Sequence, residues 1–115
     1  MRYILLIYSK EADWPTRSDK ERGEIFQQYT EFTESIRKSG HYLAGDPLQA
    51  TTSATTVRVK DGKTVSTDGP FAETREQLGG YYIVNAKDLD EATGLAARIP
   101  SARFGSIEVR PIMDM

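Results

Sequence analysis

The sequence lacks several residue types and motifs on which common activities depend. It contains no cysteine and only one histidine, so it offers no thiolate nucleophile, no disulfide and too few clustered ligands for a zinc site. The motifs G-x-G-x-x-G, G-x-x-x-x-G-K-[ST] and G-x-S-x-G are also absent, so nothing supports a nucleotide cofactor or serine chemistry. We therefore expect neither a metal nor an organic cofactor.

Charge of one sign and long apolar runs are scarce as well. Fifteen basic and seventeen acidic residues leave a formal net charge of −2, with no block of one sign. This balance does not favour direct binding to nucleic acid or to an anionic membrane. The longest apolar run, residues 3–8, is far below the ~18 residues of a membrane-spanning helix, and no signal-peptide pattern follows Arg2. We expect a cytoplasmic location.

The composition that is present suits one folded domain. Of the 115 residues, 38% are hydrophobic and 28% are charged, which is typical of a globular protein and not of a disordered chain. A chain of this length holds one hydrophobic core and is short for two. We expect a single domain over residues 1–115.

Six strands are predicted, at residues 3–8, 41–49, 56–60, 63–67, 78–84 and 106–110. The first and fifth are apolar on both faces, as central strands are. Gly45-Asp46-Pro47 interrupts or ends the second, because proline cannot donate to a strand ladder. Asp61-Gly62, between the third and fourth, predicts a two-residue hairpin with a type I′ turn.

Two helices are predicted from capping residues and apolar spacing. Ser18 and Glu21 form a capping box that opens the first helix, and Gly40 is placed to end it in a left-handed conformation. Asp88 and Glu91 repeat the capping box for a shorter second helix, with Pro100 as its stop. Residues 9–17 and 51–55 are expected to be loops.

Without the hairpin, the predicted order is βαββαβ, the ferredoxin-like arrangement of an antiparallel sheet with both helices on one face. No third helix is available for the other face, although the two central strands are apolar there too. An exposed patch of that size is unusual on a monomer. The predicted fold class is therefore α+β, a ferredoxin-like βαββαβ domain with an inserted β-hairpin that forms a homodimer.

The candidate site is the segment 68–82, which joins a rigid turn to a glycine-opened, tyrosine-rich strand. Gly69-Pro70 fixes a turn, and Gly79-Gly80 allows another backbone or a ligand to come close. Asp68 is a candidate general base, although an Asp before Gly-Pro is more often a turn residue bonded to nearby main-chain N–H groups.

Other side chains also have two interpretations. Arg75 is suited to clamp an acidic ligand with Glu73 nearby, or both are solvated. Tyr29, Tyr81 and Tyr82 offer ring surfaces with hydroxyl tips for a pocket, or are core aromatics. His41, the only histidine, is the natural candidate for proton transfer, but its place after a helix C-terminus favours a structural role.

Asp68-Gly69-Pro70-Phe71, followed by 72–74 and by 77–82, resembles the DGPF-motif branch of the YCII-related proteins. The opening strand, the Ala44-Gly45 turn, the hairpin 56–62 and the closing residues 108–112 are also similar to that family, so the resemblance spans nearly the whole chain. It implies a dimeric ferredoxin-like α+β barrel, cytoplasmic in bacteria, with a cleft beside the sheet.

The resemblance implies two classes of function. YCII-related proteins are similar to small cofactor-free lyases and isomerases with a proposed histidine–aspartate pair, but the matching position on the first helix here is Tyr29, a poor base with a reference pKa of about 10. Relatives of this branch also occur beside or fused to extracytoplasmic-function sigma factors. The two hypotheses are a ligand-binding or regulatory protein associated with sigma-factor systems, and a lyase or isomerase acting on a small organic acid or phenol.

These hypotheses share one set of candidate residues, which we expect to meet in a cleft beside the sheet. The catalytic candidates are Asp68 and Tyr29. The ligand-binding candidates are Phe71, Glu73, Arg75, Tyr81 and Tyr82.

Overall fold

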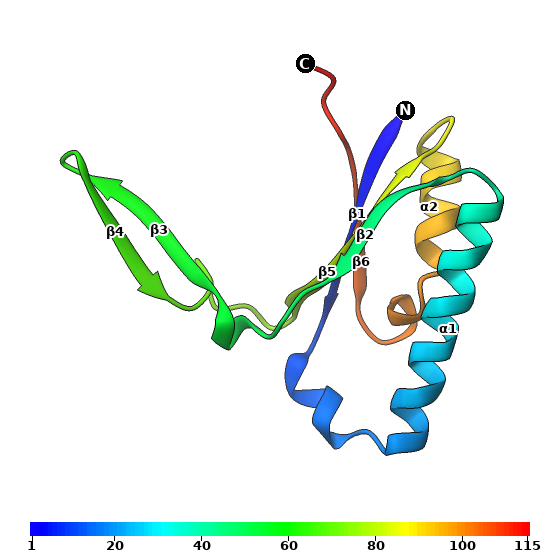
Figure 1. Cartoon of the computed structure of the whole chain (residues 1–115), viewed down its shortest axis with the longest axis horizontal. Coiled ribbons are helices and arrows are strands. Elements are labelled where there is room, and N and C mark those ends of the chain that lie inside the picture. Colours follow the sequence, from blue (N-terminus) through cyan, green and yellow to red (C-terminus); the bar gives the residue numbers. More distant parts are fainter.

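The computed structural model describes residues 1–115, which form a sheet covered by helices and a hairpin that projects from it (Figure 1). The strands are β1 (Arg2–Ser9), β2 (Tyr42–Pro47), β3 (Thr55–Lys60), β4 (Lys63–Asp68), β5 (Gln77–Asn85) and β6 (Ser106–Pro111). The helices are α1 (Asp19–Lys38) and α2 (Leu89–Ala97), with short 3-10 segments η1 (Glu11–Thr16), η2 (Thr51–Ser53) and η3 (Pro100–Arg103).

The main sheet has the strand order β2-β5-β1-β6, and all of its pairs are antiparallel. Figure 1 shows α1 and α2 together on one face of this sheet. This is the ferredoxin-like α+β arrangement with an inserted hairpin, so that part of the predicted fold class is confirmed, and the homodimer stays a prediction. The two strands predicted to be central, β1 and β5, are the inner pair.

Alternation along β1 and β5 divides the sheet residues between a helix-covered face and an open face. Leu5, opposite Tyr82 and Val109, lies on the covered face, where Leu5 and Val84 have no exposed surface. Ile4 pairs with Ile83 on the other face, and both stay partly exposed. The core therefore lies between the sheet and the helices, and a row of apolar side chains remains on the open face.

The predicted caps of α1 and α2 are present. The Ser18 hydroxyl accepts the Glu21 N–H at 3.1 Å, and Asp88 accepts the Glu91 N–H at 2.9 Å. Gly40 has φ of 80°, and the His41 N–H donates to the carbonyl of Ile36 at 2.9 Å. That bond from the second residue past the cap is typical of a Schellman ending. Local sequence signals therefore set both ends of α1.

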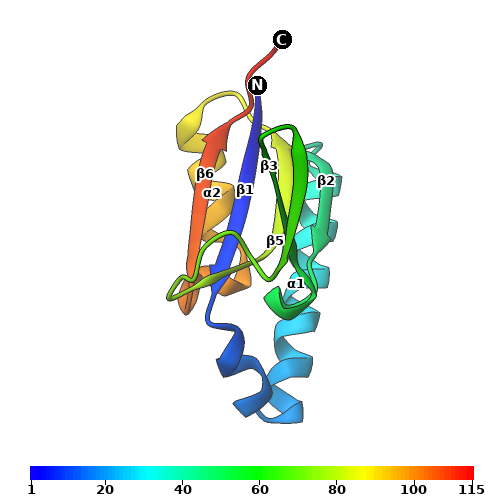
Figure 2. The same ribbon diagram turned by 90° about the vertical axis from the view of Figure 1, so that its left-hand side faces the viewer.

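Strands β3 and β4 form a separate two-stranded hairpin, residues 55–68, which we call the arm. The φ angles are 50° at Asp61 and 75° at Gly62, as a type I′ turn requires, and Lys60 lies opposite Lys63. The arm extends from the open face of the sheet, away from the helices (Figure 1). Figure 2 looks onto that face, with the arm in front and the helices behind.

Most strand boundaries differ from the prediction by one residue, and larger differences occur at four places. The loop predicted over 51–55 contains η2 and the first residue of β3. The loop predicted over 9–17 contains η1, a 3-10 segment that includes Trp14-Pro15. Helix α2 ends at Ala97, before Pro100, and Pro100 instead begins η3, because its fixed φ suits the first residue of a helical turn. Strand β2 ends at Pro47, short of the predicted residue 49. Neither α-helix combines the length and the apolar character needed to cross a membrane.

Candidate functional site

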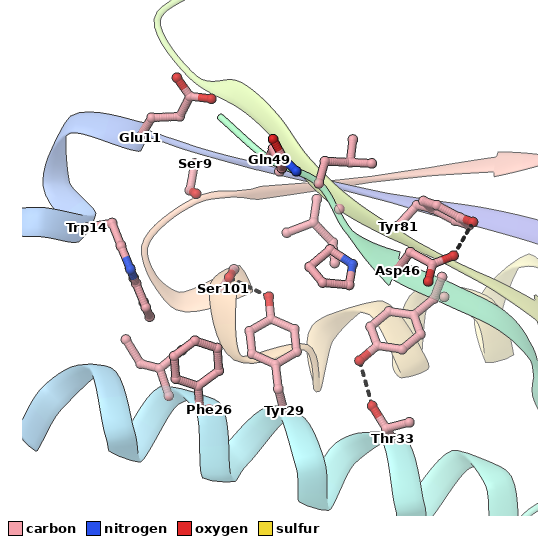
Figure 3. Close-up of a pocket in the computed structure, with 18 of the residues that line it drawn as sticks. Ser9, Glu11, Trp14, Phe26, Tyr29, Thr33, Asp46, Gln49, Tyr81 and Ser101 are labelled. Carbon is pink, nitrogen blue, oxygen red and sulfur yellow. Dashed lines mark hydrogen bonds between the residues drawn. The ribbon is translucent and has the colours of Figure 1, made fainter. Parts of the chain in front are cut away.

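A cleft of about 570 Å³ lies on the helix-covered side of the sheet, between α1, η1 and the β2–β5 pair. We call it the α1 cleft. Figure 3 shows Tyr29 and Ser101 near its middle, Trp14 and Phe26 toward one end, and Tyr81 with Asp46 toward the other. Its volume is within the roughly 300–1,000 Å³ range of small-molecule sites.

Two glycines allow close packing on the sheet side of the cleft. A Cβ on Gly80 would lie 3.1 Å from the carbonyl oxygen of Asp46, so β2 approaches β5 closely at this point. A Cβ on Gly45 would lie 2.7 Å from Cδ1 of Tyr82, so the Tyr82 ring lies directly against the glycine backbone. The predicted close backbone approach is thus observed at Gly80. At Gly79, by contrast, a Cβ would meet no atom within 4 Å.

Two pairs of hydroxyl groups lie in the cleft. The hydroxyls of Tyr29 and Ser101 are 2.5 Å apart, and those of Thr33 and Tyr82 are 2.7 Å apart. Burial raises the pKa of both Tyr29 and Tyr82 above the usual value of 10.0, because a phenolate would be poorly solvated there. Both phenols are therefore neutral near pH 7 and act as hydrogen-bonding groups rather than bases.

Two of the three carboxylates that line the cleft, Glu11 and Asp46, are already hydrogen-bonded, and the third, Asp13, is exposed. Glu11 accepts the main-chain N–H and the hydroxyl of Thr51, each at 2.7 Å. Asp46 accepts the Tyr81 hydroxyl at 2.8 Å, and this bond raises the pKa of Tyr81. These contacts join η1 to η2 and β2 to β5, so both carboxylates serve to hold the walls together.

One end of the cleft is aromatic. The rings of Trp14 and Phe26 meet edge to face with centroids 5.4 Å apart, although Phe26 is 64% exposed. The guanidinium of Arg17 lies 4.3 Å from the centre of the Phe104 ring. A wall of rings with one side open to solvent is suited to an apolar, flat ligand.

The predicted site residues divide into two groups. Tyr29, Tyr81 and Tyr82 are among the residues that line the α1 cleft, although Tyr81, opposite Leu6, alternates with Tyr82 toward the open face. Asp68, at the end of β4, and the exposed residues Phe71, Glu73 and Arg75 do not line it within one chain.

The turn that follows the arm is held by the main chain of Gly69 and not by Asp68. The Gly69 N–H donates to the Ala54 carbonyl at 2.7 Å, and the Thr56 hydroxyl donates to the Gly69 carbonyl at 2.8 Å. With φ of 103°, this position suits glycine. The predicted hydrogen bonds from main-chain N–H groups to the Asp68 side chain are absent, because the bonds of the turn go to Gly69 instead.

His41 lies outside the α1 cleft and joins the two helices. Its Nδ1 is 2.6 Å from the Ser39 hydroxyl, and its Nε2 is 3.1 Å from Oε1 of Glu91. The same Glu91 oxygen accepts the Lys87 N–H, and this bond, followed by the His41 contact, lowers the pKa of Glu91. These contacts agree with the predicted structural role. No cluster of three or more acidic or histidine side chains could hold a metal ion.

Three important cleft residues, Trp14, Phe26 and Ser101, were not predicted. One signal for Phe26 is present in the sequence, because Phe26, Tyr29 and Thr33 recur at helical spacing beside the buried stripe of α1. Trp14 was expected in a polar loop. Ser101 carries no local signal, since its position depends on how η3 packs against α1 and β1.

Comparison with known proteins gives the family. The model of the YCII-related domain matches residues 1–115. The chain belongs to the YCII-related family. An uncharacterized relative, R00369 of Rhizobium meliloti (strain 1021), is 35% identical over 114 residues, which cover 97% of this chain and 92% of the relative. The family resemblance predicted from residues 68–82 and their surroundings is confirmed.

Proposed function

We propose that the protein binds a small organic ligand in the α1 cleft and serves a regulatory role associated with a sigma-factor system. The observation that carries the binding proposal is the cleft itself, which Gly79 and Gly80 line from the sheet and whose middle holds the hydroxyl pair of Tyr29 and Ser101. Binding requires only shape and a few well-placed polar contacts.

The ionisation of the cleft favours binding over catalysis. Acid–base catalysis requires a group whose pKa is drawn toward neutrality within reach of the substrate. Burial moves the pKa of Tyr29 and Tyr82 in the opposite direction. Of the three carboxylates that line the cleft, Glu11 and Asp46 are held by hydrogen bonds to the wall, and Asp13 is exposed. Neither tyrosine is therefore poised as a base.

Trp14 provides a direct test, because it is the only tryptophan of the chain and lines the cleft. We expect saturable quenching or enhancement of its fluorescence when small phenols and carboxylates are titrated in. Phe26→Ala should weaken the response, since it removes the ring that packs against Trp14. A flat fluorescence signal and an unchanged melting temperature for the whole panel would contradict the proposal.

The alternative function is a cofactor-free lyase or isomerase acting on a small organic acid or phenol. It is favoured by the Tyr29–Ser101 pair, whose 2.5 Å separation would allow a proton to pass between the hydroxyls. Tyr29→Phe distinguishes the two functions, because it keeps the ring and removes the hydroxyl. A catalytic Tyr29 predicts a loss of turnover of roughly 10²-fold. A binding role predicts only about 1 kcal/mol of lost affinity.

The proposed functional unit is a homodimer whose two sheets pack through their open faces. The apolar side chains of Ile4, Leu6 and Ile83 would then be covered. The radius of gyration, 16.1 Å, exceeds the about 13 Å expected of a compact domain of this length, because the arm stands away from the body. An isolated two-stranded hairpin is only marginally stable, so contact with a partner would stabilise the arm. Sedimentation at micromolar concentration should give a dimer, and a well-folded monomer would refute the arrangement.

The association with a sigma factor rests on the family resemblance alone, and a cytoplasmic location is part of the same proposal. The proposed association predicts that the purified protein binds a sigma factor encoded beside it. It also predicts that a ligand in the α1 cleft changes the affinity of the protein for that sigma factor. Absence of binding in both the free and the ligand-bound state would leave a ligand-binding protein with another regulatory target.

A further inference from the structure

We propose that the ligand of the α1 cleft is an uncharged, flat aromatic compound that carries one hydrogen-bonding oxygen, held against the Tyr29–Ser101 hydroxyl pair. This inference rests on the proposed function, because it assigns a chemical class to the ligand of the same cleft. Three features of the cleft carry it: its rings, the state of its charges, and the place of its hydroxyl groups.

The rings come from separate parts of the chain. Trp14 lies on η1, Phe26 and Tyr29 on α1, Tyr82 on β5 and Phe104 just after η3, and all five line the cleft. Aromatic rings attract other rings through offset or edge-to-face contacts, beyond the area that they bury. A flat ring system can contact several of these walls at once.

The charged side chains of the cleft are already occupied or lie in solvent. They are three cations and three anions: Lys10, Arg17, Arg37, Glu11, Asp13 and Asp46. Glu11 and Asp46 are hydrogen-bonded to the walls. Arg17 lies over Phe104 and Arg37 over the Tyr42 ring, at 4.3 and 4.6 Å from the ring centres. Lys10 and Asp13 are exposed.

This arrangement disfavours a charged ligand. A carboxylate taken into the middle of the cleft would lose its hydration. The nearby guanidinium groups are already engaged, because Arg17 and Arg37 lie over aromatic rings and Arg103 donates to Gln28. An uncharged ligand has no such cost. An anionic ligand would have to draw the guanidinium groups of Arg17 and Arg37 away from the rings that they contact. The experiment therefore compares anionic and neutral probes directly.

The polar anchor is the hydroxyl pair of Tyr29 and Ser101. One hydroxyl of the pair uses its hydrogen to bond the other, and the second hydroxyl keeps a hydrogen for another acceptor. Ser101 is 6% exposed and Tyr29 is only partly buried, so we assign the contact with the ligand to the Tyr29 hydroxyl. Figure 3 shows this pair between the aromatic end of the cleft and the Tyr81–Asp46 contact. A single carbonyl or hydroxyl oxygen on the ligand would satisfy the anchor.

The size of the cleft sets the size of the ring system. A cavity of roughly 150 Å³ is enough to hold benzene. The α1 cleft, at about 570 Å³, is several times larger. Two or three fused rings would fill it better than one.

The test compares 2-naphthol, naphthalene and 2-naphthoate by isothermal titration calorimetry with the full chain at neutral pH. These probes share one ring system and differ in the hydrogen-bonding oxygen and in charge. We expect 2-naphthol to bind about fivefold more tightly than naphthalene, the effect of one hydrogen bond. We expect it to bind at least tenfold more tightly than 2-naphthoate. Decahydro-2-naphthol, which keeps the hydroxyl but is not flat, should bind more weakly than 2-naphthol.

Variants assign the effect to the anchor and the walls. Tyr29→Phe should remove the difference between 2-naphthol and naphthalene, whereas Tyr8→Phe, a matched change on β1 outside the cleft, should leave it. Phe26→Ala should weaken all the aromatic probes, and its exposed ring makes loss of folding a minor concern.

The outcomes separate the inference from the proposed function. Tighter binding of 2-naphthoate than of 2-naphthol overturns the inference and leaves the binding function standing. The same holds if Tyr29→Phe leaves the ratio of 2-naphthol to naphthalene affinities unchanged. If none of the probes binds, the inference and the proposed binding function both fail.

Discussion

Gly105→Ala is the substitution whose consequence follows most directly from the packing of the chain. Gly105 comes just after η3, where the chain turns against β1. A Cβ at this position would lie 2.1 Å from the carbonyl oxygen of Tyr8 and 3.2 Å from that of Ser101. Both are main-chain atoms, so a side-chain rotation cannot relieve the contact. Either β1 or the η3 segment has to move.

The cost can be estimated from two effects. Forcing an extra methyl group into a packed region costs about 1–3 kcal/mol. The Gly105 N–H also donates to the Ser101 carbonyl at 2.7 Å, and losing this bond adds about 1 kcal/mol. The expected loss is therefore about 2–4 kcal/mol, or roughly 6–20 °C in melting temperature at about 3–5 °C per kcal/mol. Because Ser101 moves with η3, its bond to Tyr29 should weaken as well.

Thermal and urea unfolding followed by circular dichroism measure this loss. Gly94→Ala is the matched control, because a Cβ at Gly94 in α2 meets no atom within 4 Å. Alanine is better than glycine inside a helix, so this control should gain about 0.5–1 kcal/mol. If Gly105→Ala melts within 2 °C of the parent while Gly94→Ala gains stability as expected, the packing reasoning at Gly105 is wrong.

Three further predictions concern the open face, the α1–α2 contact and the segment after the arm. Leu6→Glu places a charge on the open face and should convert the proposed dimer to a folded monomer, which light scattering at micromolar concentration would detect. The pKa of Glu91 is lowered, so its bonds to Lys87 and His41 stabilise the fold above the ordinary pKa of 4.5, and this contribution is lost as the pH falls through the pKa of the folded state. In Glu91→Gln, the free energy of unfolding in urea should therefore depend less on pH between pH 5 and pH 3. The same pH dependence in the variant and the parent would count against the contact. Phe71→Ala should leave ligand affinity within twofold, because Phe71 does not line the cleft of its own chain, and a larger loss by calorimetry would place the segment in a partner's site.

Much of the fold follows from short-range signals. The Ser18 cap, the Gly40 ending and the Asp61-Gly62 turn each involve residues a few positions apart, so the sequence contains both partners of each interaction. The strand order follows from two further facts, the apolar character of β1 and β5 on both faces and the βαββαβ order of elements that remains without the hairpin. These are properties of whole elements, so they can be recognised even when the predicted boundaries of a strand or helix are wrong by one or two residues.

The cleft was less predictable, because its walls meet only in the folded chain. Tyr29 was identified as a candidate, but its partner Ser101 lies 72 positions away and is brought to it by the packing of η3. Asp68 was proposed as a catalytic candidate because it begins a conspicuous sequence motif. The direction in which the arm leaves the sheet decides where Asp68 lies, and nothing local to 68–76 encodes that direction.

The position of β5 has a consequence for how the chain folds. Strand β5 pairs with β1 on one side and β2 on the other, and the partner of Arg2 is Asn85. Until residue 85 has left the ribosome, β1 and β2 therefore have no strand between them, and the main sheet cannot begin to form. The arm closes over a two-residue turn and needs no distant segment, so hairpin formation on a scale of about 1–10 μs precedes the slow, long-range step. During synthesis, the arm is thus the first β-structure that can close, and β1 has no strand partner until β5 has emerged.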